Sequence, residues 1–140
     1  MKVKGKQNNS RMCVICGMDN PFGVQAPFYI MEDDSVMTLF RYREEHQSYP
    51  GRVHGGLITA MLDELGFRAY WVFEPEVLAV TTTLETKYPG PCRTAYRSRE
   101  EAWSFLPPPA LSKAARRSWI WTATLLRRRK SSTSSFPPAG

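Results

Sequence analysis

The sequence predicts an α+β domain in which one long, largely buried helix packs against an antiparallel sheet. Three stretches of the chain indicate this class. Two β-rich runs flank a short polar segment, apolar residues then recur at helical spacing from Leu57 to Val72, and a β-branched stretch follows at residues 77–88. Three strands cannot enclose a helix of this length, so we expect the sheet to gain further strands after Pro91.

The first two strands are predicted at residues 28–31 and 36–42, where aromatic and β-branched side chains are frequent. The polar sequence EDDS between them predicts a hairpin. The helix that follows carries apolar side chains on more than one stripe, so we expect it to be enclosed on most sides and to end near Phe73, ahead of Pro75. Residues 77–88 then predict a long strand, which a Pro-Gly-Pro sequence ends.

The charge of the chain is unevenly distributed along its 140 residues, a length that favours one domain. Residues 1–91 contain 9 Lys and Arg against 11 Asp and Glu, whereas residues 92–140 contain 10 against 2. The overall net charge of +6 therefore comes from the last third of the chain. We accordingly divide the chain into an N-terminal segment (1–27), a central domain (28–91) and an atypical basic, Pro- and Ser-rich tail (92–140).

The cellular compartment is predicted from what the sequence lacks. No apolar run approaches the roughly 20 residues that span a bilayer, and the basic start MKVKGKQNNSRM has no apolar stretch of a signal peptide. Three cysteines are an odd number, which argues against a disulfide framework. We therefore expect a cytoplasmic protein with no membrane partner.

Cys13 and Cys16 have the spacing of a metal-binding knuckle in CVICGMDNPFG, which also contains a turn signal at Asn20-Pro21. A structural zinc site requires four ligands, and no second cysteine pair follows. We therefore expect two half-buried thiols ahead of a turn, and no metal. Pairing across a dimer is the alternative that would supply four sulfur atoms.

The helix begins with His54, Gly55 and Gly56, although glycine is a poor helix former. A helix N-terminus presents unpaired N–H groups, and glycine lets a ligand approach them closely. An oxygen that becomes negative during attack on a carbonyl is an anion that such donors stabilise. For His54 itself, capping or packing is favoured over direct catalysis.

Asp63 and Glu64 are adjacent carboxylates in the middle of this apolar helix. Buried carboxylates are costly, so they persist where they are paired, hydrogen-bonded or functional; the alternative is that both lie on a solvated edge. Asp63 follows Gly56 by about two turns, so the two lie about 10 Å apart along the axis. A carboxylate from a second, antiparallel helix would close this gap, which predicts a site built across a two-fold dimer interface.

The sequence HGGLITAMLDE, preceded by HQSYPGRV and followed by TTTLETKYPGP, resembles the hotdog-fold acyl-CoA thioesterases, especially the branch related to phenylacetic-acid degradation. The CxxCGxxNPxG opening is similar to that of many uncharacterised members. The resemblance covers about residues 13–91. It implies a hotdog fold, with a long central helix wrapped by a curved antiparallel sheet, a homodimer or homotetramer, an acyl-CoA substrate at the interface, and no cofactor.

The resemblance also implies roles for individual residues. The glycine after the motif histidine helps to form the oxyanion hole in such enzymes, and this position is Gly55, with Gly56 beside it. The carboxylate nine residues after the histidine is the base or nucleophile, here Asp63, with Glu64 as the fallback. Gln47 is the nearest candidate for a polar amide that orients water or substrate.

Residues 92–140 depart from this family, whose members continue with long strands. We hypothesise that the chain is encoded out of frame from about Cys92. Joining the third base of each codon for Trp119 to Thr124 to the next two bases gives Asp at two places, whatever the codons, and permits a hairpin turn. On this hypothesis no nucleic-acid partner is expected, and the chain is expected to be poorly soluble or inactive unless the tail, for example residues 118–126, forms strands.

Three functions therefore follow from the sequence. The first is hydrolysis of an acyl-CoA thioester. The second is binding of acyl-CoA or another small ligand without catalysis, since fold does not fix function. The third requires a genuine basic tail, and is nucleic-acid binding with zinc on Cys13 and Cys16.

Resequencing the gene through codons 85 to 140 tests the out-of-frame hypothesis. We expect one base gained or lost near codon 92, and strands of the hotdog type in the restored frame. A gene that encodes this chain without a shift, together with a soluble dimer that melts cooperatively, would contradict it.

Overall fold

The computed structural model describes residues 2–88, 101–105 and 120–124. Its elements, in chain order, are β1 (Val3–Lys6), β2 (Phe28–Met31), β3 (Val36–Phe40), the short 3₁₀ helix η1 (Glu44–His46), α1 (Gly55–Tyr70), β4 (Thr83–Lys87), β5 (Glu101–Phe105) and β6 (Ile120–Thr124). The predicted α+β class is confirmed, since one α-helix packs with strands that are largely antiparallel.

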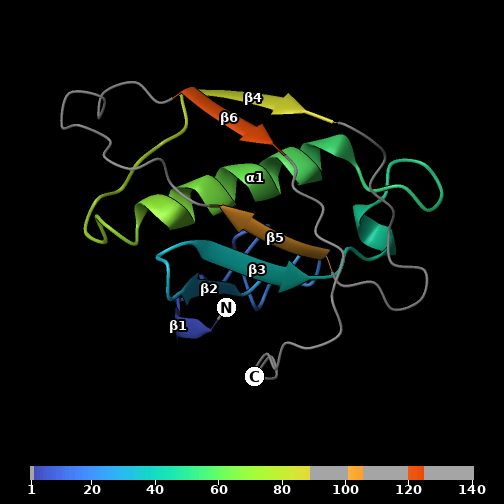
Figure 1. The fold of residues 1–140 in the computed structure, drawn as a ribbon. Coiled ribbons are helices and arrows are strands. Elements are labelled where there is room, and N and C mark those ends of the chain that lie inside the picture. Colours follow the sequence, from blue (N-terminus) through green and yellow to red (C-terminus); the bar gives the residue numbers. More distant parts are fainter. Residues whose placement is uncertain (1, 89–100, 106–119, 125–140) are drawn as a thin grey trace.

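Helix α1 lies between two layers of strands (Figure 1). On one side is a four-stranded antiparallel sheet in the order β1-β2-β3-β5, and on the other is the parallel pair β4-β6. The helix contacts β3, β5 and β6. The enclosure expected from its apolar stripes is therefore observed. The described strands form two separate sheets, however, whereas one curved antiparallel sheet was expected.

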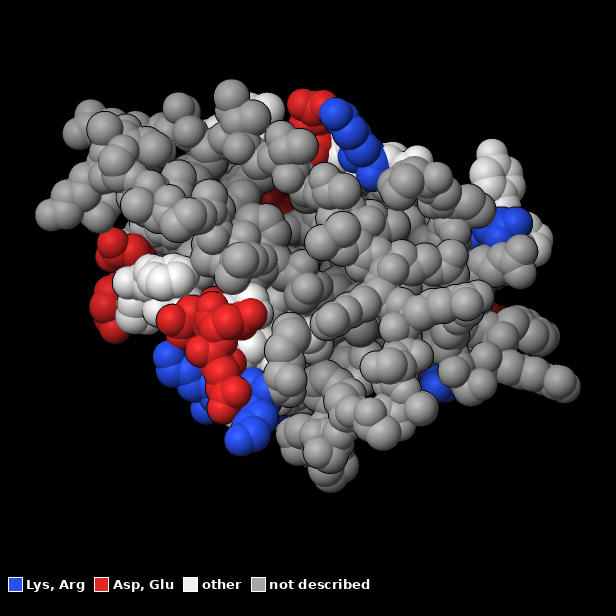
Figure 2. Space-filling model, viewed as in Figure 1, with Lys and Arg blue, Asp and Glu red and all other residues white. Residues whose placement is uncertain are grey.

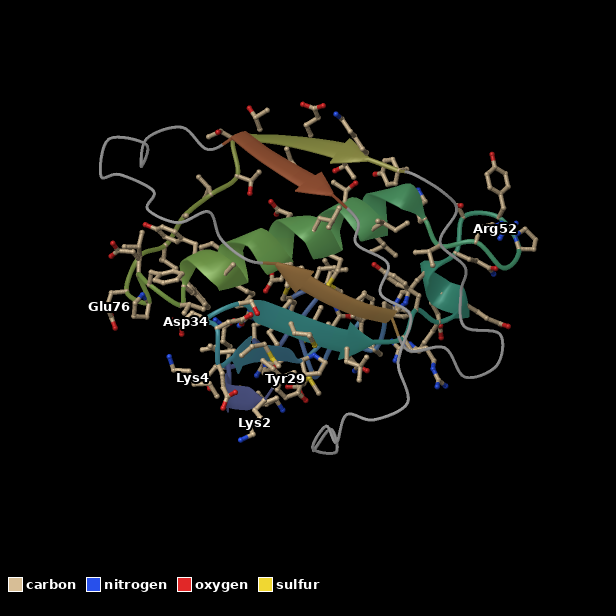
Figure 3. All side chains as sticks on the ribbon, viewed as in Figure 1. Lys2, Lys4, Tyr29, Asp34, Arg52 and Glu76 are labelled. Carbon is tan, nitrogen blue, oxygen red and sulfur yellow. The ribbon has the colours of Figure 1, made fainter. Side chains whose placement is uncertain are left out.

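The predicted hairpin is confirmed as β2 and β3, with Phe28 opposite Thr38 and Ile30 opposite Val36. Strand β1 pairs antiparallel with the other edge of β2, and the sequence did not predict it. Lysines and a glycine alternate in this stretch, so it lacks the apolar signal of a buried strand. The Lys4 ammonium lies 2.7 Å from the Asp34 carboxylate in the hairpin turn, and the two side chains point toward each other (Figure 3).

The helix ends at Tyr70, three residues before the predicted end at Phe73. The chain tightens there, because the N–H groups of Val72 and Phe73 donate to carbonyls only three residues earlier. Pro75 then prevents a return to helix. Arg52 and Glu76, which precede and follow α1, lie at opposite ends of the molecule (Figure 3).

The main core forms where α1 meets the sheet and the N-terminal segment. The helix contributes Ile58, Met61, Leu62, Leu65 and Ala69, which cluster with Phe28, Val36 and Phe40 of the strands and with Ile15 and Cys16. These helix positions recur every three or four residues, as the sequence predicts. Among the described residues, no helix combines the length and hydrophobicity needed to cross a bilayer.

The strand predicted at residues 77–88 is only partly observed. Residues 83–87 form β4, whereas residues 77–82 are not a strand, and Leu78 and Val80 are exposed. Side chains hold this stretch against the helix instead: the Trp71 indole N–H donates to the Val77 carbonyl at 2.8 Å, and the Thr81 hydroxyl donates to Asp63. These contacts position residues 77–82 beside α1.

Two of the strands come from the part of the chain after Pro91. Strand β5 pairs with β3, and β6 lies within residues 118–126, where a strand was expected if the tail forms one. Most of residues 92–140 lies outside the described residues. The out-of-frame hypothesis and the basic tail therefore stay predictions.

Core packing around α1 predicts unequal costs for truncating two apolar side chains. Met61 is fully buried, whereas Leu78 is 88% exposed. We expect Met61→Ala to lower the free energy of unfolding by about 2–5 kcal/mol, and Leu78→Ala to change it by less than about 0.5 kcal/mol. Urea unfolding of the full chain, followed by circular dichroism, measures both. Equal losses in the two variants would contradict this packing.

Candidate functional site

The adjacent carboxylates of α1 have different partners. Asp63 is half-buried, and its carboxylate accepts a short hydrogen bond from the Thr81 hydroxyl. Glu64 accepts a hydrogen bond from Nε of Arg68, one helical turn later, at 2.9 Å. Neither side chain therefore lies free on a solvated edge. The two groups offer different chemistry, because Asp63 is held by a neutral donor and Glu64 by a cation.

A cavity of about 420 Å³ lies beside this part of the helix. Its size falls within the range of roughly 300–1,000 Å³ that is typical of small-molecule sites. The residues that line it are Asp63, Glu64, Phe67, Tyr70, Ala79, Val80 and Thr81. The lining thus combines acidic and hydroxyl-bearing residues with apolar and aromatic ones, so it offers both polar and apolar contacts to a ligand.

His54 caps the start of the helix, the role that the sequence favours over direct catalysis. Its Nδ1 accepts a hydrogen bond from the Gly56 N–H at 2.9 Å. A Cβ at Gly56 would lie 3.0 Å from the same nitrogen, so a glycine fits best under the ring. One of the two N–H groups predicted to stabilise an oxyanion is therefore engaged by His54.

Tyr88 covers the first turn of α1, and sequence reasoning missed this role. Its hydroxyl donates to the Gly55 carbonyl at 3.1 Å and shares a short hydrogen bond with the Thr59 hydroxyl. Its ring lies 3.8 Å from where a Cβ at Gly55 would be. No local signal marks this contact, because Tyr88 follows Gly55 by 33 residues.

The predicted catalytic residues do not converge within one chain. Gly55 and Asp63 are separated by eight residues of continuous helix, or about 12 Å along its axis. Gln47, predicted to orient water or substrate, instead stabilises the turn before the helix. Its side-chain oxygen accepts a hydrogen bond from the Gly51 N–H at 3.2 Å. A site that uses both Gly55 and Asp63 requires a second copy of the chain.

A second cluster forms where the N-terminal segment meets α1. The sulfur atoms of Cys13 and Cys16 and a carboxylate oxygen of Glu64 all lie within 4.8 Å of one another. Burial raises the pKa of the Cys16 thiol, an effect that its contact with Ser10 partly opposes. The spacing of the two cysteines predicts that they lie close together. It does not predict the approach of Glu64, which follows Cys13 by 51 residues.

Arg68 is the buried cation beside this cluster, and the sequence did not single it out. Its side chain is only 4% exposed. Besides Glu64, its guanidinium donates to the Asn8 carbonyl at 2.6 Å and lies over the rings of Phe28 and Trp71. A buried charge is tolerated only when it is paired in this way.

Comparisons with protein-family models, with curated proteins and with solved structures return no match to this chain. The hotdog thioesterase resemblance of residues 13–91 therefore stays a prediction that rests on the quoted motifs.

Proposed function

We propose that this chain is an acyl-CoA thioesterase-like protein of the hotdog type that hydrolyses a CoA thioester at a site shared between two copies. The observation that carries the proposal is Asp63, a half-buried carboxylate on the central helix that lines a cavity with both polar and apolar walls. An acyl group can pack against the apolar part of this lining, such as Phe67 and Val80, and a carboxylate beside it can serve as a general base.

In the proposed reaction, Asp63 takes a proton from a water molecule, whose oxygen attacks the thioester carbonyl. The carbonyl oxygen becomes negative and is stabilised by the Gly55 N–H at the positive end of a helix. The intermediate then collapses, the carbon–sulfur bond breaks, and the CoA thiolate leaves and is protonated. Direct attack by Asp63, with water hydrolysing the resulting anhydride, is the alternative route. Neither route needs a cofactor.

The proposed site requires two copies because Gly55 and Asp63 lie about 12 Å apart along one helix. A two-fold axis beside α1 would run two helices antiparallel and bring Gly55 of one copy toward Asp63 of the other. Such an arrangement gives two equivalent sites per homodimer, and a homotetramer would contain four. The Gly56 N–H is engaged by His54, so the Gly55 N–H is the donor left for the oxyanion in this arrangement.

A binding protein without catalysis is the second candidate, and the helix N-terminus favours it. The Gly56 N–H already donates to His54, and Tyr88 covers the first turn of α1. Fewer free donors would weaken stabilisation of an oxyanion while leaving the cavity able to hold an acyl group or another small ligand.

Nucleic-acid binding has the least support. The basic residues that would carry it belong to residues 92–140, most of which lie outside the described residues. On the face in Figure 2, some of the described Lys and Arg side chains lie next to Asp and Glu side chains, so the described residues of this face do not form one basic patch.

Replacing Asp63 distinguishes an enzyme from a binding protein. We expect Asp63→Asn to lower kcat for a reactive acyl-CoA by about 10²- to 10⁴-fold, with little change in affinity, because only the proton acceptor is lost. Thiol release over a panel of acyl-CoA thioesters measures hydrolysis, and calorimetry measures binding. Both the full chain and its frame-restored version should be assayed.

Glu85→Gln is the matched control, since Glu85 is an exposed carboxylate outside the cavity. It is expected to behave like the unmodified chain. Hydrolysis that survives in Asp63→Asn would contradict the proposed base. Acyl-CoA binding without hydrolysis in the unmodified and frame-restored chains would instead establish the second candidate.

A further inference from the structure

Two thiols and a carboxylate converge at the junction between the N-terminal segment and α1. The sulfur of Cys13 lies 3.9 Å from Oε2 of Glu64, and Cys16 completes a triangle whose three atoms lie within 4.8 Å of one another. We propose that Cys13, Cys16 and Glu64 bind one Zn²⁺ ion through two thiolates and one carboxylate oxygen, with a water molecule as the fourth ligand.

The backbone between the two cysteines forms a turn that brings their sulfur atoms close together. The Cys13 sulfur accepts hydrogen bonds from the N–H groups of Ile15 at 3.3 Å and Cys16 at 3.5 Å. The Gly17 N–H closes the turn onto the Cys13 carbonyl at 2.9 Å. The turn therefore places both sulfur atoms within 4.8 Å of a Glu64 carboxylate oxygen.

Gly17 makes this turn possible. A Cβ at this position would lie 2.4 Å from the carbonyl oxygen of Cys13 and 2.5 Å from its nitrogen, so no other residue fits without moving the backbone. The sequence Cys-x-x-Cys-Gly thus specifies a turn that presents two sulfur atoms on one side. A pair of ordinary buried thiols does not require such a constraint.

Arg68 orients the Glu64 carboxylate so that one of its oxygen atoms faces the cysteines. Its Nε holds Oε1 of the carboxylate at 2.9 Å, which leaves Oε2 facing the Cys13 sulfur. Hydrogen bonds of this kind orient the ligands of metal ions. The charges also balance, because two thiolates and one carboxylate with Zn²⁺ leave a single negative charge, which the buried guanidinium neutralises.

The separations suit a tetrahedral ion. Zinc bonds of about 2.3 Å to sulfur and about 2.0–2.2 Å to oxygen place neighbouring ligand atoms roughly 3.5–3.8 Å apart. The pair Cys13 and Glu64 already matches this, at 3.9 Å, and the widest separation need close by only about 1 Å. Soft sulfur ligands select zinc over calcium or magnesium.

Binding would replace the two thiol protons, which pass to solvent, and would fasten the N-terminal segment to the central helix. This inference does not rest on the proposed thioester hydrolysis, because its ligands do not include Asp63, the proposed base, although Glu64 also lines the cavity. It departs from the expectation, drawn from the sequence, that no metal binds. The sequence did not predict that the Glu64 carboxylate of α1 lies beside the two cysteines, so it offered too few ligands for a metal ion.

Zinc content and cobalt spectroscopy of the full chain test the proposal. The protein, purified with a non-thiol reductant, is expected to hold one zinc per chain by elemental analysis. When Co²⁺ replaces zinc, we expect a sulfur-to-cobalt charge-transfer band whose intensity corresponds to two thiolate ligands. The visible absorption bands should have the high intensity that is typical of tetrahedral cobalt. Cys13→Ser should abolish stoichiometric zinc, and Glu64→Gln should weaken zinc binding at least about tenfold.

Matched controls are Cys92→Ser and Glu76→Gln, because Cys92 is the third cysteine and Glu76 is an exposed carboxylate outside the cluster. Both should retain one zinc per chain. Zinc-free protein that gains no charge-transfer band with cobalt would overturn the proposal, as would equal zinc loss in Cys92→Ser and Cys13→Ser. If Cys13→Ser fails to fold, the charge-transfer band of the cobalt-loaded unmodified chain is the deciding measurement. A band weaker than that expected for two thiolate ligands overturns the zinc proposal.

Discussion

The buried ion pair between Arg68 and Glu64 is the interaction on which the arrangement of the helix depends. Removing a guanidinium from water costs several kcal/mol, so the pair persists only because the surroundings satisfy it. Arg68 donates to Glu64 of the same helix and to the Asn8 carbonyl, and it lies over Phe28 of β2. One side chain thereby joins the central helix to the N-terminal segment and to the sheet.

This pair also explains why two adjacent carboxylates persist in an apolar helix. Glu64 is committed to Arg68 and to the cysteine turn, so it is a poor candidate for a catalytic base. Asp63 lies about 100° around the helix from Glu64, and its carboxylate accepts a hydrogen bond from Thr81 beside the cavity that both residues line. The structure thus separates a carboxylate that supports the fold, and in our proposal a metal ion, from one that is available to a ligand.

The sequence predicted features that depend on neighbouring residues. The spacing of Met61, Leu62 and Leu65 located the helix, the polar turn located the hairpin, and the chemistry of His54 indicated its cap. The missed features depend on residues far apart in the chain. The exposure of Leu78 and Val80, the burial of Arg68 and the approach of Glu64 to Cys13 follow from how the elements pack, which no local pattern contains.

A double-mutant cycle on Glu64 and Arg68 tests the central role of this pair most directly. The free energies of unfolding of the full chain, of Glu64→Gln, of Arg68→Met and of the double variant would be measured in urea, with a chelator present to exclude metal. The pair should couple the two residues by at least about 1 kcal/mol, so that the double variant loses less stability than the two single losses combined. Losses that add to within about 0.5 kcal/mol would contradict the account.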